Sequence, residues 1–473
     1  MKMTKYKLGE LVEVTRGASL SGQFYAEEGK LIRLTLGNFN MNGGGFKENT
    51  SKTDLYFTGT VRDEFILNKG DIITPLTEQS LGLLGTTARI PESGKYIQSQ
   101  DVALVRCKEG LLDPNFCYYL ISSSIVRQQL SAAAQQTKIR HTSPEKIKDC
   151  TVWVPDFEVQ KNIGRILTDI DNKIAINRRI NDNLEAMAKQ LYDYWFVQFD
   201  FPNEEGKPYK SSGGAMVWNE KLKREIPQGW DSSMLQSICT IKRGASPRPI
   251  DDFMDESHKG MPWVKISDAT NSNSPFMTTI KEHIILDGVP QSVKVIPNTL
   301  IVSNSATPGI PKFIQIEACV HDGWLVLTDY QEIYKYYLYY VIKMIRHNLL
   351  HIASGSIFKN LKTDYLKEFI CITPSTEILS KYHNLVKPIM QEILLLQQDT
   401  EALTKQRDEL LPLLMNGQAS VNYHLSAKVY PLPIAYKKAM PIVANQTISN
   451  IFNQKSDSHT PSPCLQTSQI HCS

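Results

Sequence analysis

The 473-residue sequence lacks long apolar runs. No uninterrupted run approaches about 18 residues, the length that a membrane-spanning helix needs. The first residues, MKMTKYKLGELVEV, also lack the apolar core of a secretory signal peptide. We therefore expect a cytoplasmic protein that does not associate with a membrane.

Cysteine pairs with a recognisable function are also lacking. The eight cysteines form no CxxC pair, and no histidine follows them at the spacing of a zinc site. Six of them, at positions 107, 117, 150, 239, 319 and 371, lie in or beside apolar stretches. This pattern indicates buried free thiols and favours neither a metal site nor a disulfide framework.

An excess of one charge is missing as well. The chain has 52 Lys and Arg against 49 Asp and Glu. Residues 420–473 contribute four Lys and one Asp, so 48 basic and 48 acidic residues remain in residues 1–419. A DNA-binding surface would therefore have to gather its basic residues locally, because phosphate attraction depends on local charge.

Catalytic motifs are absent too, although three segments resemble them. Asp156 followed by Asp171 and Lys173 matches a nuclease pattern, but the latter two fall in a helical pattern where charges belong on solvated faces. Asp113-Pro-Asn-Phe is typical of a helix N-terminus. The three glycines at 43–45 lack the spacing of a phosphate-binding loop. We predict a chain with no active site and no bound metal or cofactor.

An internal repeat is present. TRGAS at 15–19 recurs as KRGAS at 242–246, and IKDCTVWVP at 147–155 matches LKEFICITP at 366–374. The arginine and the final proline of these anchors are 139 positions apart in the first half and 131 in the second. Two halves of similar length with different interiors indicate one scaffold that carries two different surfaces.

Each half is followed by a heptad-like apolar pattern, with steps of four and three that are typical of a coiled-coil seam. The first seam contains Ile163, Leu167, Ile170, Ile174, Asn177, Asn181, Leu184, Ala188, Leu191 and Trp195. The second contains Val386, Ile389, Ile393, Leu396, Thr400, Leu403, Arg407, Leu410 and Leu414, and ends at Asn416-Gly417. Polar seam positions fix register and partner. Two helices of roughly 60 Å each are expected to pack on each other antiparallel.

The predicted fold class is mixed α/β (α+β), with two globular domains separated by two long helices that form an antiparallel coiled coil. The expected plan is a first domain at 1–157, a central helix at 158–199, a linker at 200–229, a second domain at 230–376, a distal helix at 377–417, and a disordered tail at 418–473.

Basic and polar loops occupy matching places in the two halves. Some flank the glycine turns after the first strand, and others precede the last strand, so they are candidates for contacts with phosphates or guanine edges. The alternative is that they are ordinary solvated loop residues. The candidate DNA-contacting residues are Arg16, Ser19, Lys138, Arg140 and His141 in the first half, and Arg243, Ser246, Arg248, Lys359, Asn360 and Lys362 in the second.

Three segments carry a family resemblance. They are LYDYWFVQFDFPNEEGKPYKSSGGAMVWNEKLKREIPQGW at 191–230, the VPxxxxQKxI pattern at 154–163, and LLPLLMNGQASV at 410–421. On the basis of these segments, residues 5–425 resemble the specificity (S) subunits of type I restriction-modification systems. The second helix departs from this pattern, because it begins without the glutamine of the first.

The resemblance implies two target recognition domains that read the two parts of a split DNA sequence. It also implies that the helices set the spacing and dock two modification (methyltransferase) subunits, with restriction (motor-nuclease) subunits completing the complex. S-adenosylmethionine, ATP and Mg²⁺ would then act in those partners. Two alternatives stay open, a specificity-like subunit or nuclease of a related restriction system and a coiled-coil adaptor that binds protein.

Overall fold

The computed structural model describes residues 1–40, 44–78, 82–133, 140–270, 272–352 and 361–419. The described chain divides into two compact units. Unit 1 contains residues 1–176 and 400–419, and unit 2 contains residues 177–399. Nearly all of the predicted tail lies outside the described residues. No helix of the described chain is long and apolar enough to cross a membrane.

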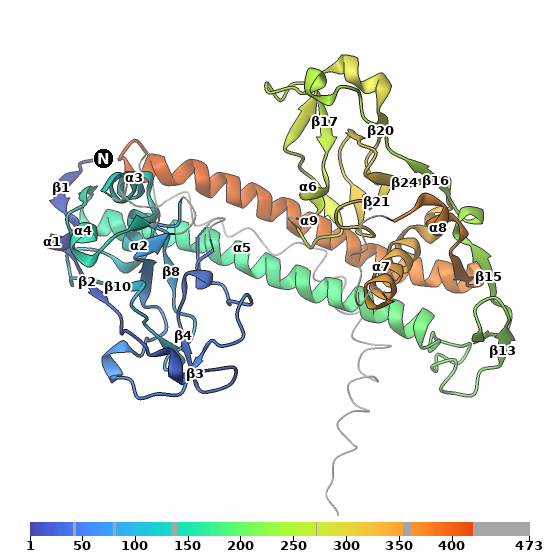
Figure 1. Ribbon diagram of the computed structural model, residues 1–473, viewed down its shortest axis with the longest axis horizontal. Coiled ribbons are helices and arrows are strands. Elements are labelled where there is room, and N and C mark those ends of the chain that lie inside the picture. The colour runs from blue at the N-terminus through green and yellow to red at the C-terminus, as the bar shows by residue number, and fades with distance from the viewer. Residues whose placement is uncertain (41–43, 79–81, 134–139, 271, 353–360, 420–473) are drawn as a thin grey trace, which may run out of the picture. The chain divides into compact units, whose positions relative to one another are not determined.

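Two long helices, α5 (Phe157–Tyr192) and α9 (Thr376–Met415), dominate Figure 1 and contribute residues to both units. A π-helical turn at Asp193–Val197 extends α5. The second helix ends where the Asn-Gly pair predicts, and Gly417 has the left-handed φ of 71° that favours glycine after a helix.

Unit 1 holds four small sheets and four short helices. The sheets, in strand order, are β1 (Thr4–Lys7) with β12 (Thr151–Val154); β2 (Val12–Arg16), β10 (Val102–Cys107), β6 (Ile72–Pro75) and β8 (Ala88–Arg89); β11 (Arg140–His141) with β7 (Thr77–Glu78); and β3 (Tyr25–Ala26), β5 (Tyr56–Phe57), β4 (Leu31–Arg33) and β9 (Tyr96–Ile97). The helices are α1 (Leu8–Leu11), α2 (Pro114–Ser122), α3 (Ser124–Ala133) and α4 (Pro144–Lys148).

Unit 2 repeats part of this arrangement. Its sheets are β15 (Asp231–Met234) with β25 (Ile370–Thr373); β16 (Thr240–Arg243), β24 (Trp324–Thr328), β21 (Leu300–Ser303), β22 (Pro311–Ile314) and β18 (Phe276–Met277); β19 (Glu282–Ile284), β17 (Met261–Val264), β23 (Ala318–Val320) and β20 (Val293–Val295); and β13 (Met216–Asn219) with β14 (Arg224–Pro227). Its helices are α6 (Ile266–Thr270), α7 (Lys335–Ile352) and α8 (Thr363–Glu368).

The predicted duplication is visible in the strand pairing. Strand β10 lies between β2 and β6 in unit 1, and β24 lies between β16 and β21 in unit 2. Strand β1 in unit 1 and strand β15 in unit 2 each pair antiparallel with the strand that precedes a long helix. The repeated sequence anchors therefore occupy equivalent strands, while the intervening segments differ.

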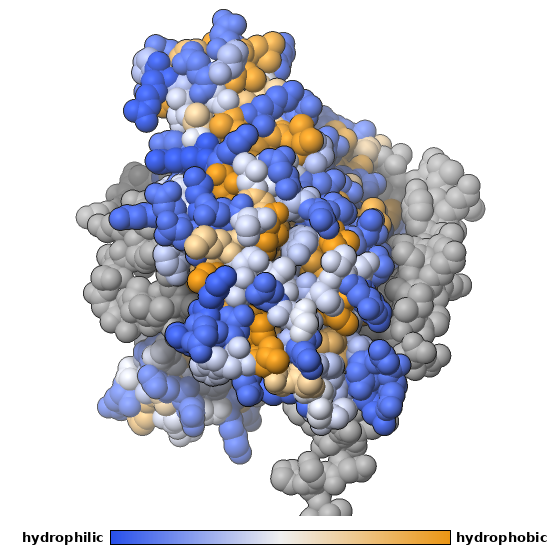
Figure 2. Space-filling model, turned by 90° about the vertical axis from the view of Figure 1, so that its right-hand side faces the viewer, coloured by the Kyte–Doolittle hydropathy of each residue, from blue (hydrophilic) through white to orange (hydrophobic). Residues whose placement is uncertain are grey.

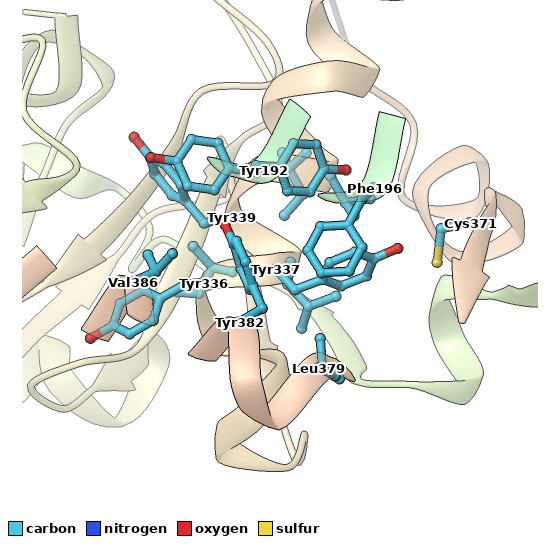
Figure 3. Packing of buried hydrophobic residues seen from close by; sticks show 14 of the residues in the cluster. Tyr192, Phe196, Tyr336, Tyr337, Tyr339, Cys371, Leu379, Tyr382 and Val386 are labelled. Atoms are coloured by element: carbon cyan, nitrogen blue, oxygen red, sulfur yellow. The ribbon is translucent and has the colours of Figure 1, made fainter. Parts of the chain in front are cut away.

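An aromatic core joins the elements of unit 2 (Figure 3). Phe196 packs against Tyr337 of α7 and Tyr382 of α9, with ring centroids 4.9 and 4.8 Å apart. Tyr192 stacks on Tyr340 at 5.3 Å. Aromatic rings bury large apolar areas and prefer such edge-to-face and stacked contacts. The end of α5, the start of α9 and α7 consequently share one core.

The segment 200–229, which its composition led us to expect as a surface-crossing linker, contains secondary structure of its own. It contains the β13–β14 hairpin, and Phe201 stacks between Tyr209 and Trp230 at 4.7 and 4.9 Å. Phe201 and Ile226 are buried in the unit 2 core. Gly206 and Gly213 lie in a bend and a turn, whereas Arg224, Glu225 and Pro227 belong to β14. Figure 2 shows apolar groups scattered among polar ones on the side that carries the hairpin.

A buried ion pair crosses the helix seam in unit 1. Arg407 of α9 donates through Nη1 to Asp171 of α5 at 2.9 Å, and Asp171 also accepts from the Tyr119 hydroxyl at 2.6 Å. The expectation that Asp171 occupies a solvated face is therefore wrong. Its side chain is 30% exposed and serves the helix pairing, because a polar seam residue requires a partner on the facing helix.

Replacing Arg407 with alanine is expected to lower the free energy of unfolding by about 2 to 3 kcal/mol, since Asp171 keeps its charge but loses its cation. Urea denaturation followed by circular dichroism measures this change. Lys405→Ala on the same helix is the control, because Lys405 forms only an exposed ion pair with Glu409. Equal effects of the two substitutions would contradict the proposed importance of the seam pair.

A second buried charge lies in unit 2. Lys312 of β22 is 2% exposed, and its ammonium donates to the carbonyl oxygens of Ser272, at 2.6 Å, and Ser274. Burial lowers the pKa of Lys312 to about 8, although Glu185 opposes the shift. The folded protein then binds fewer protons than the unfolded chain between this value and the ordinary lysine pKa.

Unfolding free energy is therefore expected to rise with pH between about pH 8 and 10, with a slope of up to about 1.4 kcal/mol per pH unit from Lys312. In Lys312→Met this contribution should vanish, whereas Lys294→Met, which removes an exposed ion pair with Glu317, should retain it. Urea titrations at several pH values test the difference. Parallel pH dependences for the wild type and Lys312→Met would refute the assignment.

Candidate nucleic-acid interface

Glycine turns after the first strand of each main sheet place an arginine in the same way in both units. A Cβ atom at Gly17 would lie 2.3 Å from the Gln98 carbonyl oxygen, and one at Gly244 would lie 2.1 Å from that of His321. Only glycine permits so close an approach. The turn therefore passes directly over a neighbouring backbone segment.

The arginines before these glycines are anchored alike. Arg16 donates through Nε to the Gln100 carbonyl oxygen at 2.9 Å, and Arg243 donates through Nε to that of Asp322 at 2.7 Å. Both arginines are exposed, as is Ser19. An anchored but exposed guanidinium keeps donors for a phosphate or a base edge. The repeat prediction of two matching basic turns agrees with this geometry.

The two turns differ in charge. The Asp322 carboxylate accepts from Ser246 Oγ at 2.9 Å and lies 3.6 Å from Arg243 Nη2 and 3.9 Å from Arg248 Nη2. Partial burial opposes the shift, but the Ser246 hydrogen bond and the Arg243 charge hold the pKa of Asp322 below its ordinary value. Strand register places the neutral Gln100 at this position in unit 1. The basic residues of unit 2 are thus partly neutralised.

The loops before the last strand are only partly described. Lys138, Lys359 and Asn360 lie outside the described residues. Lys362 is exposed and directly precedes α8. Its neighbour Leu361 donates its amide to the Asn304 carbonyl oxygen at 2.7 Å. This contact places the loop beside the end of β21.

Arg140 and His141 form β11 in unit 1, which pairs with β7. Arg140 donates through Nη1 to Glu78 at 3.4 Å and to Ser131 Oγ at 3.3 Å. His141 is exposed, and its Nδ1 lies 3.3 Å from Thr77 Oγ1. The structure therefore places Arg140 and His141 together on one short strand. In sequence this strand is distant from the Gly17 turn.

Sequence reasoning missed Glu78 and Asp322, the two carboxylates that hold the candidate arginines. Neither lies in a motif, and Glu78 is 62 positions away from Arg140 in sequence. Asp322 is aligned with Gln100 only by the strand pairing. Without the register that alignment is invisible.

Both seams contain the residues that face the partner helix within each unit. In unit 1, Ile163 and Leu167 share a core cluster with Leu414. In unit 2, Asn177 donates to Asp399 at 2.9 Å and Asn181 donates to the Ile393 carbonyl oxygen at 3.3 Å. The buried seam residues are Ile163, Leu167, Ile174, Asn177, Val386, Ile389, Ile393 and Leu396, and the half-buried ones are Ile170, Asn181, Leu184, Leu191, Leu403 and Leu410.

The motif look-alikes serve structural roles. Asp113 caps α2 by accepting the Phe116 amide at 2.9 Å, with Pro114 in the first turn. Asp171 belongs to the seam ion pair. Among the described residues, no group of three or more His, Cys, Asp or Glu side chains is arranged to hold a metal ion. Cys117, Cys150, Cys239, Cys319 and Cys371 are buried free thiols.

Comparisons with known proteins place this architecture in a family. The family profile described as "Type I restriction modification DNA specificity domain" matches residues 1–186 and 227–405. The specificity subunit of the type I restriction enzyme MjaIX from Methanocaldococcus jannaschii is 24% identical over 322 residues, which cover 66% of this chain and 71% of that protein. The HindI specificity subunit from Haemophilus influenzae is 24% identical over 378 residues, covering 68% and 81%.

A solved structure shares the fold. The S subunit of a type I restriction-modification system from M. genitalium superposes with a TM-score of 0.55 at 16% identity, covering 88% of this chain and 96% of that one. The profile matches twice and accounts for more than half of the sequence. The chain therefore belongs to the type I restriction-modification DNA specificity family, as a specificity subunit with two copies of the family domain.

Proposed function

We propose that this specificity subunit reads a bipartite DNA target, one part with each unit. The observation that carries the proposal is the repeated glycine turn, which anchors Arg16 and Arg243 through the same backbone contact while leaving both exposed. Basic groups held in a defined place suit contacts to phosphates and to base edges. Two turns with different surroundings suit two different half-sites.

The long helices act as a spacer in this proposal, as an antiparallel coiled coil. Two polar contacts between α5 and α9 support it, Asp171 with Arg407 in unit 1 and Asn177 with Asp399 in unit 2. As the residue number rises along α5, the number of its partner on α9 falls, which is the order expected of antiparallel helices. Polar seam pairs of this kind specify one register. Fixed register would fix the distance between the two half-sites.

The outer faces of the helices dock two methyltransferase subunits, and restriction subunits complete the complex. Exposed apolar side chains on α9, Leu385 and Leu395, support a docking role, since Leu395 is 56% exposed. The chain itself is non-catalytic in this proposal. S-adenosylmethionine, ATP and Mg²⁺ act in the partner subunits.

The decisive experiment maps methylation. The chain, purified with its modification partner and supplied with S-adenosylmethionine, should methylate genomic DNA at one recurrent split motif. Arg16→Ala and Arg243→Ala should each weaken recognition of a different half of that motif. Methylation without a recurrent split motif would overturn the proposal.

A protein-binding adaptor is the competing function. Alanine replacement of Arg140, His141, Lys359 and Lys362 would leave an adaptor intact. For a DNA reader the same variant should bind DNA more weakly and show a shallower dependence of affinity on salt concentration. Unchanged affinity and salt dependence would favour the adaptor.

Asp322→Asn is expected to strengthen non-specific DNA binding by roughly 3- to 10-fold at low salt and to steepen its salt dependence, because a negative charge beside Arg243 and Arg248 is removed. Fluorescence anisotropy with a random duplex measures this. Asp329→Asn, at the residue that directly follows β24, removes the same charge at the other end of that strand and is the matched control, with a smaller expected gain. Equal gains in both variants would show a mere effect of net charge.

A further inference from the structure

Glu78, at the end of β7 in unit 1, carries a buried carboxylate. Its side chain is 3% exposed. Through Oε2 it accepts three backbone amides, those of Gly82, Leu83 and Leu84, at 3.1, 3.0 and 3.1 Å. A buried carboxylate needs such partners. They hold Glu78 in one place and tie the segment after β7 to it.

The second oxygen of Glu78 holds Arg140. Oε1 accepts from Arg140 Nη1 at 3.4 Å, and the same nitrogen donates to Ser131 Oγ of α3 at 3.3 Å. Strand pairing sets Arg140 directly opposite Glu78. One nitrogen of the guanidinium therefore serves two anchors from two different elements, and this orients the whole planar group.

The opposite edge of the Arg140 guanidinium carries Nε and Nη2. Among the residues that the structure describes, none bonds to Nε or Nη2 of Arg140, whose side chain is 28% exposed. These two nitrogens form a parallel pair of donors, the geometry that matches O6 and N7 of guanine. An anchored guanidinium loses little freedom when it makes that bidentate contact.

Polar side chains, together with Leu84, line the space beside the two anchors of Arg140. A cleft of about 350 Å³ adjoins the two anchors, because Glu78 and Ser131 both line it. Its other walls include Ser124, Arg127 and Gln128. Hydroxyl, amide and guanidinium groups of this kind contact DNA sugars and phosphates. The cleft thus suits a DNA strand beside the base that Arg140 would meet.

In unit 2 the position equivalent to Glu78 holds no carboxylate. In unit 1 the amide of Thr142 donates to the carbonyl oxygen of Leu76, and in unit 2 the amide of Leu361 donates in the same way to Asn304. Together with the register of the neighbouring strands, these contacts show that Ala306 occupies the position of Glu78. Alanine has no carboxylate to hold a cation. A change at Glu78 should accordingly affect only the half-site that unit 1 reads.

We propose that Arg140 reads a guanine in the half-site of unit 1 and that Glu78 is the positioning residue that aims it. This rests on the proposed reading of a split DNA target. We assign Arg140 to a base edge because its anchored guanidinium presents two parallel donors, which suit a bidentate acceptor. A phosphate contact is an outcome that the experiment distinguishes.

The test uses the chain in complex with its modification partner. In Arg140→Lys, which keeps the charge but not the paired donors, methylation mapping should show discrimination at one guanine of one half-site falling by roughly 10- to 100-fold. The other half, identified by Arg243→Ala, should be unchanged. Replacing that guanine by 7-deazaguanine in a duplex should weaken wild-type binding but not that of Arg140→Lys.

Glu78→Gln tests the positioning role. Glu78→Gln should lower the discrimination in favour of guanine at the same position of the motif. The double variant with Arg140→Lys should lose no more discrimination than Arg140→Lys alone. Thermal unfolding verifies the fold. A lower melting temperature with an unchanged motif would make Glu78 merely structural. Arg62→Ala, which removes an exposed arginine paired with Glu64, is the control and should leave the motif intact.

The outcomes separate the two proposals. Loss of affinity for all sequences alike in Arg140→Lys, with an intact motif, would make Arg140 a phosphate contact and overturn the guanine assignment. A split motif without guanine in the half of unit 1 would do the same while leaving the bipartite function standing. Failure of the wild type to produce any split motif would instead overturn the function.

Discussion

Burial of the apolar stripes of α5 and α9 is the constraint on which the rest of the structure depends. A helix of 36 or 40 residues with charged outer faces cannot bury its own stripe. Each unit resolves this by packing a segment of one helix against a segment of the other, and its sheets add to the same core. Polar residues within the stripes have partners on the facing helix: Arg407 bonds to Asp171, and Asn177 bonds to Asp399.

A shared framework with divergent surfaces follows from that constraint. The strand pairs and the anchored arginines are common to both units, because they support the core and the turn over it. The carboxylates around them differ. Asp322 neutralises its turn, whereas Gln100 does not, and Glu78 holds Arg140 where unit 2 has Ala306. Under the proposed function, such electrostatic differences at equivalent positions would let one scaffold distinguish two half-sites.

Local patterns were sufficient for the elements with strong periodicity. Steps of four and three located both long helices, and the Asn-Gly pair located the end of the second. The repeated Arg-Gly motif located both turns. At 200–229 the Gly, Pro and charged residues gave no indication of the β13–β14 hairpin or of the burial of Phe201 and Ile226. Helical periodicity was misleading for Asp171, because a seam tolerates a charge whose partner lies on the other helix.

The sequence by itself determined the duplication, the long helices and the family to which the chain belongs, because these depend on repeats and spacings within continuous segments. Only the tertiary structure decided which charges meet. Glu78 and Arg140 are distant in sequence, as are Asp171 and Arg407, and nothing local to either partner signals the other. Strand register and helix pairing create these contacts, and they orient the groups that would read DNA.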